Sequence, residues 1–143
     1  MKVREIMTGP VVRIQPEETV SVAARMLEHN NIGAMPVCDS GGRLCGVVTD
    51  RDIVTRCLAA GKKPENTSVG EIMTGKVYVA RPEMEVSLAA GIMGREQIRR
   101  LPVMENGRLC GMVSLGDLAR REKSGINVGD ALAEISSHLS SRE

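Results

Sequence analysis

The sequence almost lacks aromatic residues: its 143 residues include no tryptophan, no phenylalanine and one tyrosine, Tyr78. A core must therefore be built from aliphatic side chains and the nine methionines. Proteins that bind single-stranded nucleic acid without sequence preference stack bases on aromatic rings, so no nucleic-acid partner is expected. The 19 basic and 18 acidic residues leave a formal net charge of +1, which provides no general field for nucleic acid or an anionic membrane.

Long apolar runs are missing as well. A membrane-spanning helix needs about 18 consecutive apolar residues, and the sequence contains no such stretch. The segment from Met1 to Glu5 leads into a patterned region without the apolar core of a signal peptide. We therefore expect a soluble, cytoplasmic protein with no membrane partner.

The residues of catalytic and metal sites are scarce. The sequence holds two histidines and four cysteines, and no C-x-x-C pair occurs among them. We interpret the cysteines as small buried apolar residues, with a redox or metal role as the alternative. No Ser-His-Asp set, Cys-His set or carboxylate cluster suggests catalysis. The sequence thus predicts no enzyme, no metal site and no resident cofactor.

An internal repeat organises the chain. The segment Val3–Gly9 (VREIMTG) returns as Val69–Gly75 (VGEIMTG), at a shift of 66 residues. The stretch Leu44–Ile53 (LCGVVTDRDI) returns as Leu109–Leu118 (LCGMVSLGDL), at a shift of 65. A fixed period of this kind indicates a duplicated structural unit. We expect one repeat over residues 1–61, a polar linker over 62–68 and a second repeat over 69–124.

Each repeat has the pattern of a β-α-β-β-α unit. Short strands are expected at residues 11–14 and 77–80, each followed by an amphipathic helix. The first of these helices covers residues 19–29, with Thr19 as a plausible N-cap. In the second repeat, apolar residues with the same helical spacing begin at Val86.

Each unit ends with a hairpin and a closing helix. The turns Gly41-Gly42 and Asn106-Gly107 are typical of hairpins, and they connect two further strands. The closing helix of the first repeat is expected to have an apolar face made of Ile53, Val54, Cys57 and Leu58.

A helix outside the repeats is predicted over residues 125–143. Asn127 is its possible cap, and its apolar face consists of Val128, Leu132, Ile135 and Leu139.

Because a unit of about 60 residues buries little apolar surface alone, we expect two α/β (α+β) halves that pack on each other with pseudo-twofold symmetry.

A hydroxyl residue and a carboxylate stand three positions apart in both copies of the repeated stretch: Thr49 and Asp52, then Ser114 and Asp117. On the first turn of a helix they lie together, where unpaired N–H groups and the positive end of the helix dipole attract anions. We therefore expect a phosphate and a ribose to bind there. The alternative is that these residues act only as helix caps and favourable charges.

The order of these motifs resembles a tandem pair of CBS motifs, the regulatory units named after cystathionine β-synthase, from residue 3 to about residue 121. The matching signatures are I-M-T at each repeat start, Pro16 and Pro82, Pro36-Val37 and Pro102-Val103, and the G-x-V-[TS]-x-x-D endings. The resemblance implies a Bateman module: two repeats packed through their sheets, with two clefts that bind adenosine-containing ligands in many relatives. It also implies a flat homodimer of such modules.

The resemblance also implies roles for individual residues. The carboxylates of Asp52 and Asp117 would hold ribose hydroxyls, and Thr49 and Ser114 would contact phosphate or ribose. The residues that match the family's base-binding surface are Val11, Val12, Val77, Tyr78 and the segment of Ile32, Gly33, Ala34 and Met35. Pro36 and Pro102 are further predicted ligand contacts. For Tyr78, simple packing in a strand is the alternative to stacking on a base.

Two arginines, Arg99 and Arg100, make the repeats unequal, because Gly33 and Ala34 stand there in the first repeat. The pair is similar to the basic pair before L-P-V in the nucleotide-sensing subunit of AMP-activated protein kinase, where it contacts phosphates. Arginine can bind phosphate through two donors, so an anionic ligand should favour the cleft that this pair reaches. Two solvated arginines at a helix end are the alternative. Arg51 is a second candidate for phosphate binding.

Taken together, the residues predict a regulatory module that binds an adenine nucleotide or adenosine derivative and passes ligand occupancy to an unidentified partner protein. AMP, ADP and ATP are the expected ligands, with NAD and S-adenosylmethionine as further candidates. The alternative is a ligand-free dimeric scaffold whose C-terminal helix recruits a partner.

Overall fold

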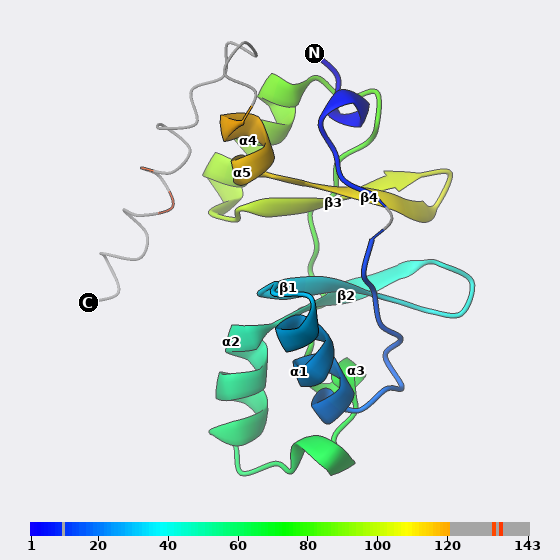
Figure 1. Cartoon of the computed structure of the whole chain (residues 1–143), viewed down its shortest axis with the longest axis vertical. Helices are drawn as coiled ribbons and strands as arrows, with labels where there is room; N and C mark the ends of the chain where they lie inside the picture. The colour runs from blue at the N-terminus through cyan, green and yellow to red at the C-terminus, as the bar shows by residue number, and fades with distance from the viewer. Residues whose placement is uncertain (10, 121–132, 134, 136–143) are drawn as a thin grey trace. The chain divides into compact units, whose positions relative to one another are not determined.

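The computed structural model describes residues 1–9, 11–120, 133 and 135. The chain forms two compact units (Figure 1). Residues 12–77 make up one, which we call the central unit from its place in the sequence, and residues 1–11 with 78–143 make up the other, which we call the terminal unit. Both contain helices and a two-stranded sheet, so the predicted α+β class is confirmed.

The central unit is built around the antiparallel hairpin of β1 (Ala34–Cys38) and β2 (Leu44–Thr49). Its helical elements are α1 (Val20–His29), α2 (Asp50–Asp52), the π-helix η2 (Ile53–Leu58), the 3-10 turn η3 (Pro64–Asn66) and α3 (Val69–Ile72). The side chain of Thr19 accepts a hydrogen bond from the backbone N–H of Val22 at 3.3 Å, which confirms the predicted N-cap of α1.

The terminal unit has the same plan. Its hairpin consists of β3 (Arg100–Glu105) and β4 (Arg108–Ser114), and its helices are η1 (Val3–Glu5), α4 (Val86–Glu96) and α5 (Leu115–Ala119). Asn106 and Gly107 connect the strands with φ angles of 53° and 77°. Positive φ at both central residues is the geometry of a type I′ turn, so the predicted hairpin is confirmed.

The strands predicted at residues 11–14 and 77–80 are each reduced to a single parallel bridge. Ile14 pairs with Val37 in the central unit, and Ala80 pairs with Val103 in the terminal unit. Prolines follow two residues later in both cases. Because proline has no N–H to donate to a ladder, the pairing cannot extend past the proline.

The predicted apolar face of the closing helix in the first repeat is only half correct. Ile53 and Cys57 are buried, but Val54 and Leu58 are 55% and 54% exposed. Ile53 and Cys57 lie about one helical turn apart and share the inward face. Val54 and Leu58 each follow one of them by a single residue and lie outside that face.

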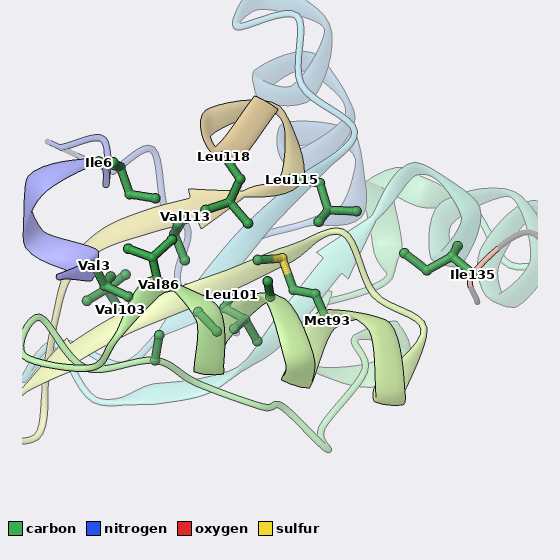
Figure 2. Packing of buried hydrophobic residues seen from close by; sticks show 13 residues of the cluster. Val3, Ile6, Val86, Met93, Leu101, Val103, Val113, Leu115, Leu118 and Ile135 are labelled. Carbon is green, nitrogen blue, oxygen red and sulfur yellow. The ribbon is translucent and has the colours of Figure 1, made fainter. Parts of the chain in front are cut away.

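Each I-M-T-G segment packs in the unit that holds the hairpin of the other repeat. Val3 and Ile6 belong to the apolar cluster of the terminal unit, with Val86, Leu101 and Val113 among its members (Figure 2). In the central unit, Val69 and Ile72 are fully buried in the corresponding cluster. The repeats of the sequence and the compact units of the structure therefore divide the chain differently.

Backbone pairing attaches each I-M-T-G segment to the hairpin of the compact unit in which it packs. Thr8 exchanges two N–H···O bonds with Met112, at 2.9 and 3.0 Å, and Thr74 does the same with Val47. A Cβ atom on Gly46 would lie 2.5 Å from the carbonyl oxygen of Thr74. A glycine is thus required where the segment crosses β2.

A capping box begins α3, the helix that leads to Thr74. The carboxylate of Glu71 accepts hydrogen bonds from the backbone N–H and the hydroxyl of Ser68, at 2.7 and 3.1 Å. These hydrogen bonds hold the pKa of Glu71 below its ordinary value of 4.5.

Replacing Glu71 by glutamine should remove a pH-dependent part of the stability. A carboxyl group whose pKa is lowered in the folded state stabilises the fold above its unfolded pKa, and this contribution is lost as the pH falls through the folded pKa. Thermal unfolding should therefore show Glu71→Gln less stable than the parent near neutral pH. The two proteins should converge in acid, and a constant difference across the pH range would contradict the assigned cap.

The helix predicted over residues 125–143 lies outside the described residues except for Ala133 and Ile135. Both are helical, and Ile135 is buried in the cluster of the terminal unit. Within the described part of the chain, no helix combines the length and the apolar character needed to cross a membrane.

Candidate ligand site

The predicted turn of the central unit lies where β2 ends and α2 begins. The backbone N–H of Asp52 donates to the hydroxyl oxygen of Thr49 at 2.9 Å, and the N–H of Thr49 donates to Oδ2 of Asp52 at 3.1 Å. This reciprocal pair is a capping box. The structure therefore confirms the helix start and the capping role of both residues.

The carboxylate of Asp52 has two further partners. The hydroxyl of Thr74 lies 3.3 Å from each of its oxygens, and Nε of Arg56 lies 3.6 Å from Oδ1. Arg56 also donates to the carbonyl oxygens of Ile72 and Met73, at 3.5 and 3.2 Å. Asp52 is only 6% exposed, so its charge is held by neighbours from its own unit.

The terminal unit repeats the cap with different outer partners. The N–H of Asp117 donates to Oγ of Ser114 at 3.1 Å, and the N–H of Ser114 donates to Oδ2 of Asp117 at 2.8 Å. Oδ1 of Asp117 pairs with the guanidinium of Arg120, and Asp117 is 7% exposed. Thr8, the counterpart of Thr74, donates to the carbonyl oxygen of Met112 instead.

Capping leaves room for a second role. An ionised carboxylate offers about four acceptor positions, and the cap uses one of them on each aspartate. A ligand hydroxyl would have to use the others. At both turns it would meet a side chain that already contacts the carboxylate.

The arginine pair lies beside the Ser114–Asp117 turn. Arg100 is the cross-strand partner of Ser114, and the carbonyl oxygen of Arg99 accepts a hydrogen bond from the N–H of Leu115 at 3.0 Å. Both arginines are exposed. Neither guanidinium forms a hydrogen bond or an ion pair with another described residue. The predicted phosphate-binding pair and the predicted turn therefore belong to one unit.

The equivalent positions of the central unit carry no such charge. Ala34 is the cross-strand partner of Thr49, and the carbonyl oxygen of Gly33 accepts the N–H of Asp50 at 2.9 Å. Asp50 adds a carboxylate where the terminal unit has the buried Leu115.

Formal charge thus differs between the two turns. In the central unit, the turn and its neighbours balance the carboxylates of Asp50 and Asp52 with the guanidinium groups of Arg51 and Arg56. In the terminal unit, the turn and its neighbours carry one carboxylate, Asp117, and three arginines, Arg99, Arg100 and Arg120, of which Arg120 contacts the carboxylate. The terminal turn is the more favourable place for an anion.

The residues predicted to face a base differ in exposure. Met35 is fully buried in the core of the central unit, and Pro36 and Pro102 are buried in their strands. Ala34 is partly exposed at the start of β1. Val12 and Tyr78 are half-buried and pack against the apolar cluster of their respective units.

The central unit also has an open groove with a volume of about 630 Å³. It is lined by Ala24, Leu27, Glu28, Asn31, Ile32, Gly33, Asp50, Ile53 and Val54. Ile32 and Gly33 of the predicted base-binding segment line it, whereas Thr49, Arg51 and Asp52 do not.

Sequence reasoning missed the groups that hold the two carboxylates. Thr74 lies in the I-M-T signature, but the motif does not reveal which group the hydroxyl contacts. Arg56 and Arg120 follow their aspartates by four and three positions. This is the spacing of helical ion pairs, so a search for such pairs could have found them.

The described residues contain no group of three or more histidine, cysteine, aspartate or glutamate side chains that could hold a metal ion. Cys38 and Cys57 are buried, and Cys45 and Cys110 are partly buried; all four are free thiols. Burial raises the pKa of Cys38 and of Cys110. A raised pKa reduces the thiolate form on which metal binding and nucleophilic reactivity depend.

Comparison with known proteins gives consistent matches along the chain. The chain is 39% identical over 134 residues to the CBS domain-containing protein YhcV of Bacillus subtilis, covering 94% of each protein. It is 37% identical over 117 residues to Hypoxic response protein 1 of Mycobacterium tuberculosis, covering 82% of each.

Solved structures agree with these matches. A crystal structure of Hypoxic Response Protein I with two coordinated zinc ions has a TM-score of 0.78 and 36% identity, covering 84% of this chain and 98% of that one. The CBS domain pair of protein MJ0100, in complex with 5′-methylthioadenosine and S-adenosyl-L-methionine, has a TM-score of 0.76 and 30% identity, covering 86% and 96%.

A family model for the CBS domain matches residues 3–59 and 69–124. Both matches correspond to the repeats recognised in the sequence. The chain therefore belongs to the CBS-domain family, as a tandem pair of CBS domains.

Proposed function

We propose that this chain is a regulatory module that binds an adenosine-containing ligand at its two helix-start turns and passes ligand occupancy to a partner protein. The observation that carries the proposal is the pairing of a hydroxyl and a carboxylate on one helical turn in both units. The relative that was solved with 5′-methylthioadenosine and S-adenosylmethionine supports the ligand class. No catalytic step is part of the proposal.

The terminal turn is the proposed site for a phosphate-bearing ligand such as AMP, ADP or ATP. Asp117 would accept the ribose hydroxyls and Ser114 would contact ribose or phosphate. Arg99 and Arg100 would bind the phosphate, since they are exposed and lie beside Ser114. Arginine binds phosphate through paired N–H donors.

The central turn is the proposed site for an adenosine derivative without phosphates. Its balanced charges give no preference for an anion, and a neutral thioether or a sulfonium nucleoside fits this environment. Thr49 and Asp52 would bind the ribose, and Arg51, which stands between them in the sequence, would bind any anionic group. The proposed base contacts are Val12, Ala34, Met35 and Pro36 in the central unit and Tyr78 and Pro102 in the terminal unit, of which only Val12, Ala34 and Tyr78 are not buried.

Thermal unfolding of the full chain with AMP, ADP, ATP, NAD, 5′-methylthioadenosine and S-adenosylmethionine tests the proposal. A ligand that binds only the folded state stabilises it by about 2.7 kcal/mol when its concentration is 100 times Kd. We expect at least one of these ligands to raise Tm in proportion to the logarithm of its concentration. No shift with any of them at millimolar concentration would contradict the proposal.

Replacing Asp117 by asparagine should weaken AMP binding about tenfold or more, because a hydrogen bond to a charged group contributes about 1.5–3 kcal/mol. Asparagine keeps the shape and the acceptor oxygen for the N–H of Ser114. Isothermal titration calorimetry of the full chain measures the loss. Asp52→Asn is the matched control, and equal AMP affinities in both variants would remove the assigned difference between the turns.

A ligand-free dimeric scaffold is the second candidate function. It is favoured by the burial of both carboxylates and by their contacts within their own units. Val54, Leu58 and Leu88 are large apolar side chains more than half exposed, as a homodimer interface would require. A dimer by light scattering, together with no response to any ligand, would favour this function.

A further inference from the structure

The two threonines of the I-M-T-G segments contact different groups. Thr8 and Thr74 stand at equivalent positions in the repeats. The hydroxyl of Thr74 lies 3.3 Å from both carboxylate oxygens of Asp52, whereas the hydroxyl of Thr8 lies 3.4 Å from the carbonyl oxygen of Met112. Asp52 therefore has a hydroxyl donor that Asp117 lacks among the described residues.

The backbone holds the hydroxyl of Thr74 against Asp52. The N–H of Thr74 donates to the carbonyl oxygen of Val47 at 2.9 Å, and the N–H of Val47 donates to the carbonyl oxygen of Thr74 at 3.0 Å. Arg56 links the same segment to the carboxylate, because it contacts both Asp52 and the carbonyl oxygen of Met73. Residues 72–74 and Asp52 thus form one hydrogen-bonded network within the central unit.

A ribose would bring hydroxyl groups to the carboxylate oxygens of Asp52 that the hydroxyl of Thr74 already contacts. Its two hydroxyls would donate to the oxygens of Asp52, which already accept from Thr49 and Thr74 and lie near Arg56. Because Asp52 is only 6% exposed, the two hydroxyls of an incoming ribose would have to replace the hydroxyl of Thr74. At Asp117 the corresponding position carries no such donor.

We propose that Thr74 competes with ligand ribose for Asp52 and thereby weakens binding at the central turn. Ligand binding there breaks the contact between Thr74 and α2, so occupancy of the turn is coupled to the segment of residues 72–74. At the terminal turn no threonine hydroxyl competes among the described residues, because Thr8 contacts backbone, and Arg120 is the side chain that pairs with Asp117 there. This inference rests on the proposed function and adds the regulation of one of its two sites.

Thr74→Val tests the competition, and Thr8→Val is its matched control. Valine has nearly the shape of threonine but no hydroxyl. The probe is 5′-methylthioadenosine, titrated calorimetrically into the full chain. We expect Thr74→Val to bind more tightly by about tenfold or more, since a hydrogen bond to a charged group contributes about 1.5–3 kcal/mol, and Thr8→Val to bind like the parent.

A double-mutant cycle assigns the effect to Asp52. In an Asp52→Asn background the gain from Thr74→Val should disappear, because the two side chains act as a pair. Hydrogen exchange supplies a readout without ligand: the amides of Val47 and Thr74 should exchange faster in Thr74→Val than in the parent. Thr74→Ala provides a second variant if circular dichroism shows that the valine variant is unfolded.

The outcomes separate the two proposals. If the parent binds the probe and Thr74→Val binds equally or more weakly, the competition is wrong and the proposed function stands. If neither the parent nor any variant binds any tested adenosine ligand, the proposed function is wrong and the competition falls with it.

Discussion

Replacing Gly46 by alanine should lower the free energy of unfolding by about 3 kcal/mol, at the upper end of the usual cost of overpacking. The added Cβ would lie 2.5 Å from the carbonyl oxygen of Thr74 and 2.9 Å from Sδ of Met73. The sulfur can move, but the carbonyl belongs to backbone that is paired with Val47. Relief of the clash therefore requires the 73–74 segment to separate from β2.

Urea and thermal unfolding followed by circular dichroism measure this loss. Gly75→Ala is the matched control in the same segment, because a Cβ there has no atom within 4 Å. Gly111→Ala in the terminal unit should be less destabilising, since its nearest contact is the flexible Sδ of Met7 at 2.8 Å, with the carbonyl oxygen of Thr8 at 3.0 Å. Parent-like stability of Gly46→Ala would contradict the packing of this segment on β2.

Replacing Arg99 and Arg100 together by alanine should weaken ATP binding by about a hundredfold or more. Each hydrogen bond between a guanidinium and a phosphate contributes about 1.5–3 kcal/mol, and the two side chains lie beside the Ser114 turn with no competing partner among the described residues. Without them, one arginine and one carboxylate, Arg120 and Asp117, remain at this turn.

A ligand that has no phosphate provides the control for this prediction. Binding of 5′-methylthioadenosine, which has no phosphate, should change less than twofold in the double variant. Arg108→Ala removes an exposed arginine from the other end of the same hairpin and should leave ATP binding unchanged. Because ion pairing is screened by salt, the difference between parent and double variant should shrink as ionic strength rises. An equal loss for both ligands would indicate a structural role instead.

Much of the fold could be predicted from the sequence because its determinants are local. The cap of α1 at Thr19 and the turn at Asn106-Gly107 depend on residues only a few positions apart. The capping boxes at Thr49 and Ser114 also lie within one helical turn. Residue identity and spacing are sufficient to predict such features.

Long-range pairing explains what could not be predicted. The strands expected at residues 11–14 and 77–80 needed a partner along their whole length, and each found one bridge. The exposure of Val54 and Leu58 depends on how far the rest of the unit covers η2, which the spacing of apolar residues does not reveal.

The sequence alone determined the duplicated CBS architecture, the hairpins, the caps and the inequality introduced by Arg99 and Arg100, because period, turn chemistry and charge are properties of residues and their spacing. Only the tertiary structure decided that each I-M-T-G segment packs with the hairpin of the other repeat, and that Thr74 but not Thr8 contacts an aspartate. Identical motifs carry identical local information. The partner that each hydroxyl finds depends on where the folded chain brings distant residues together.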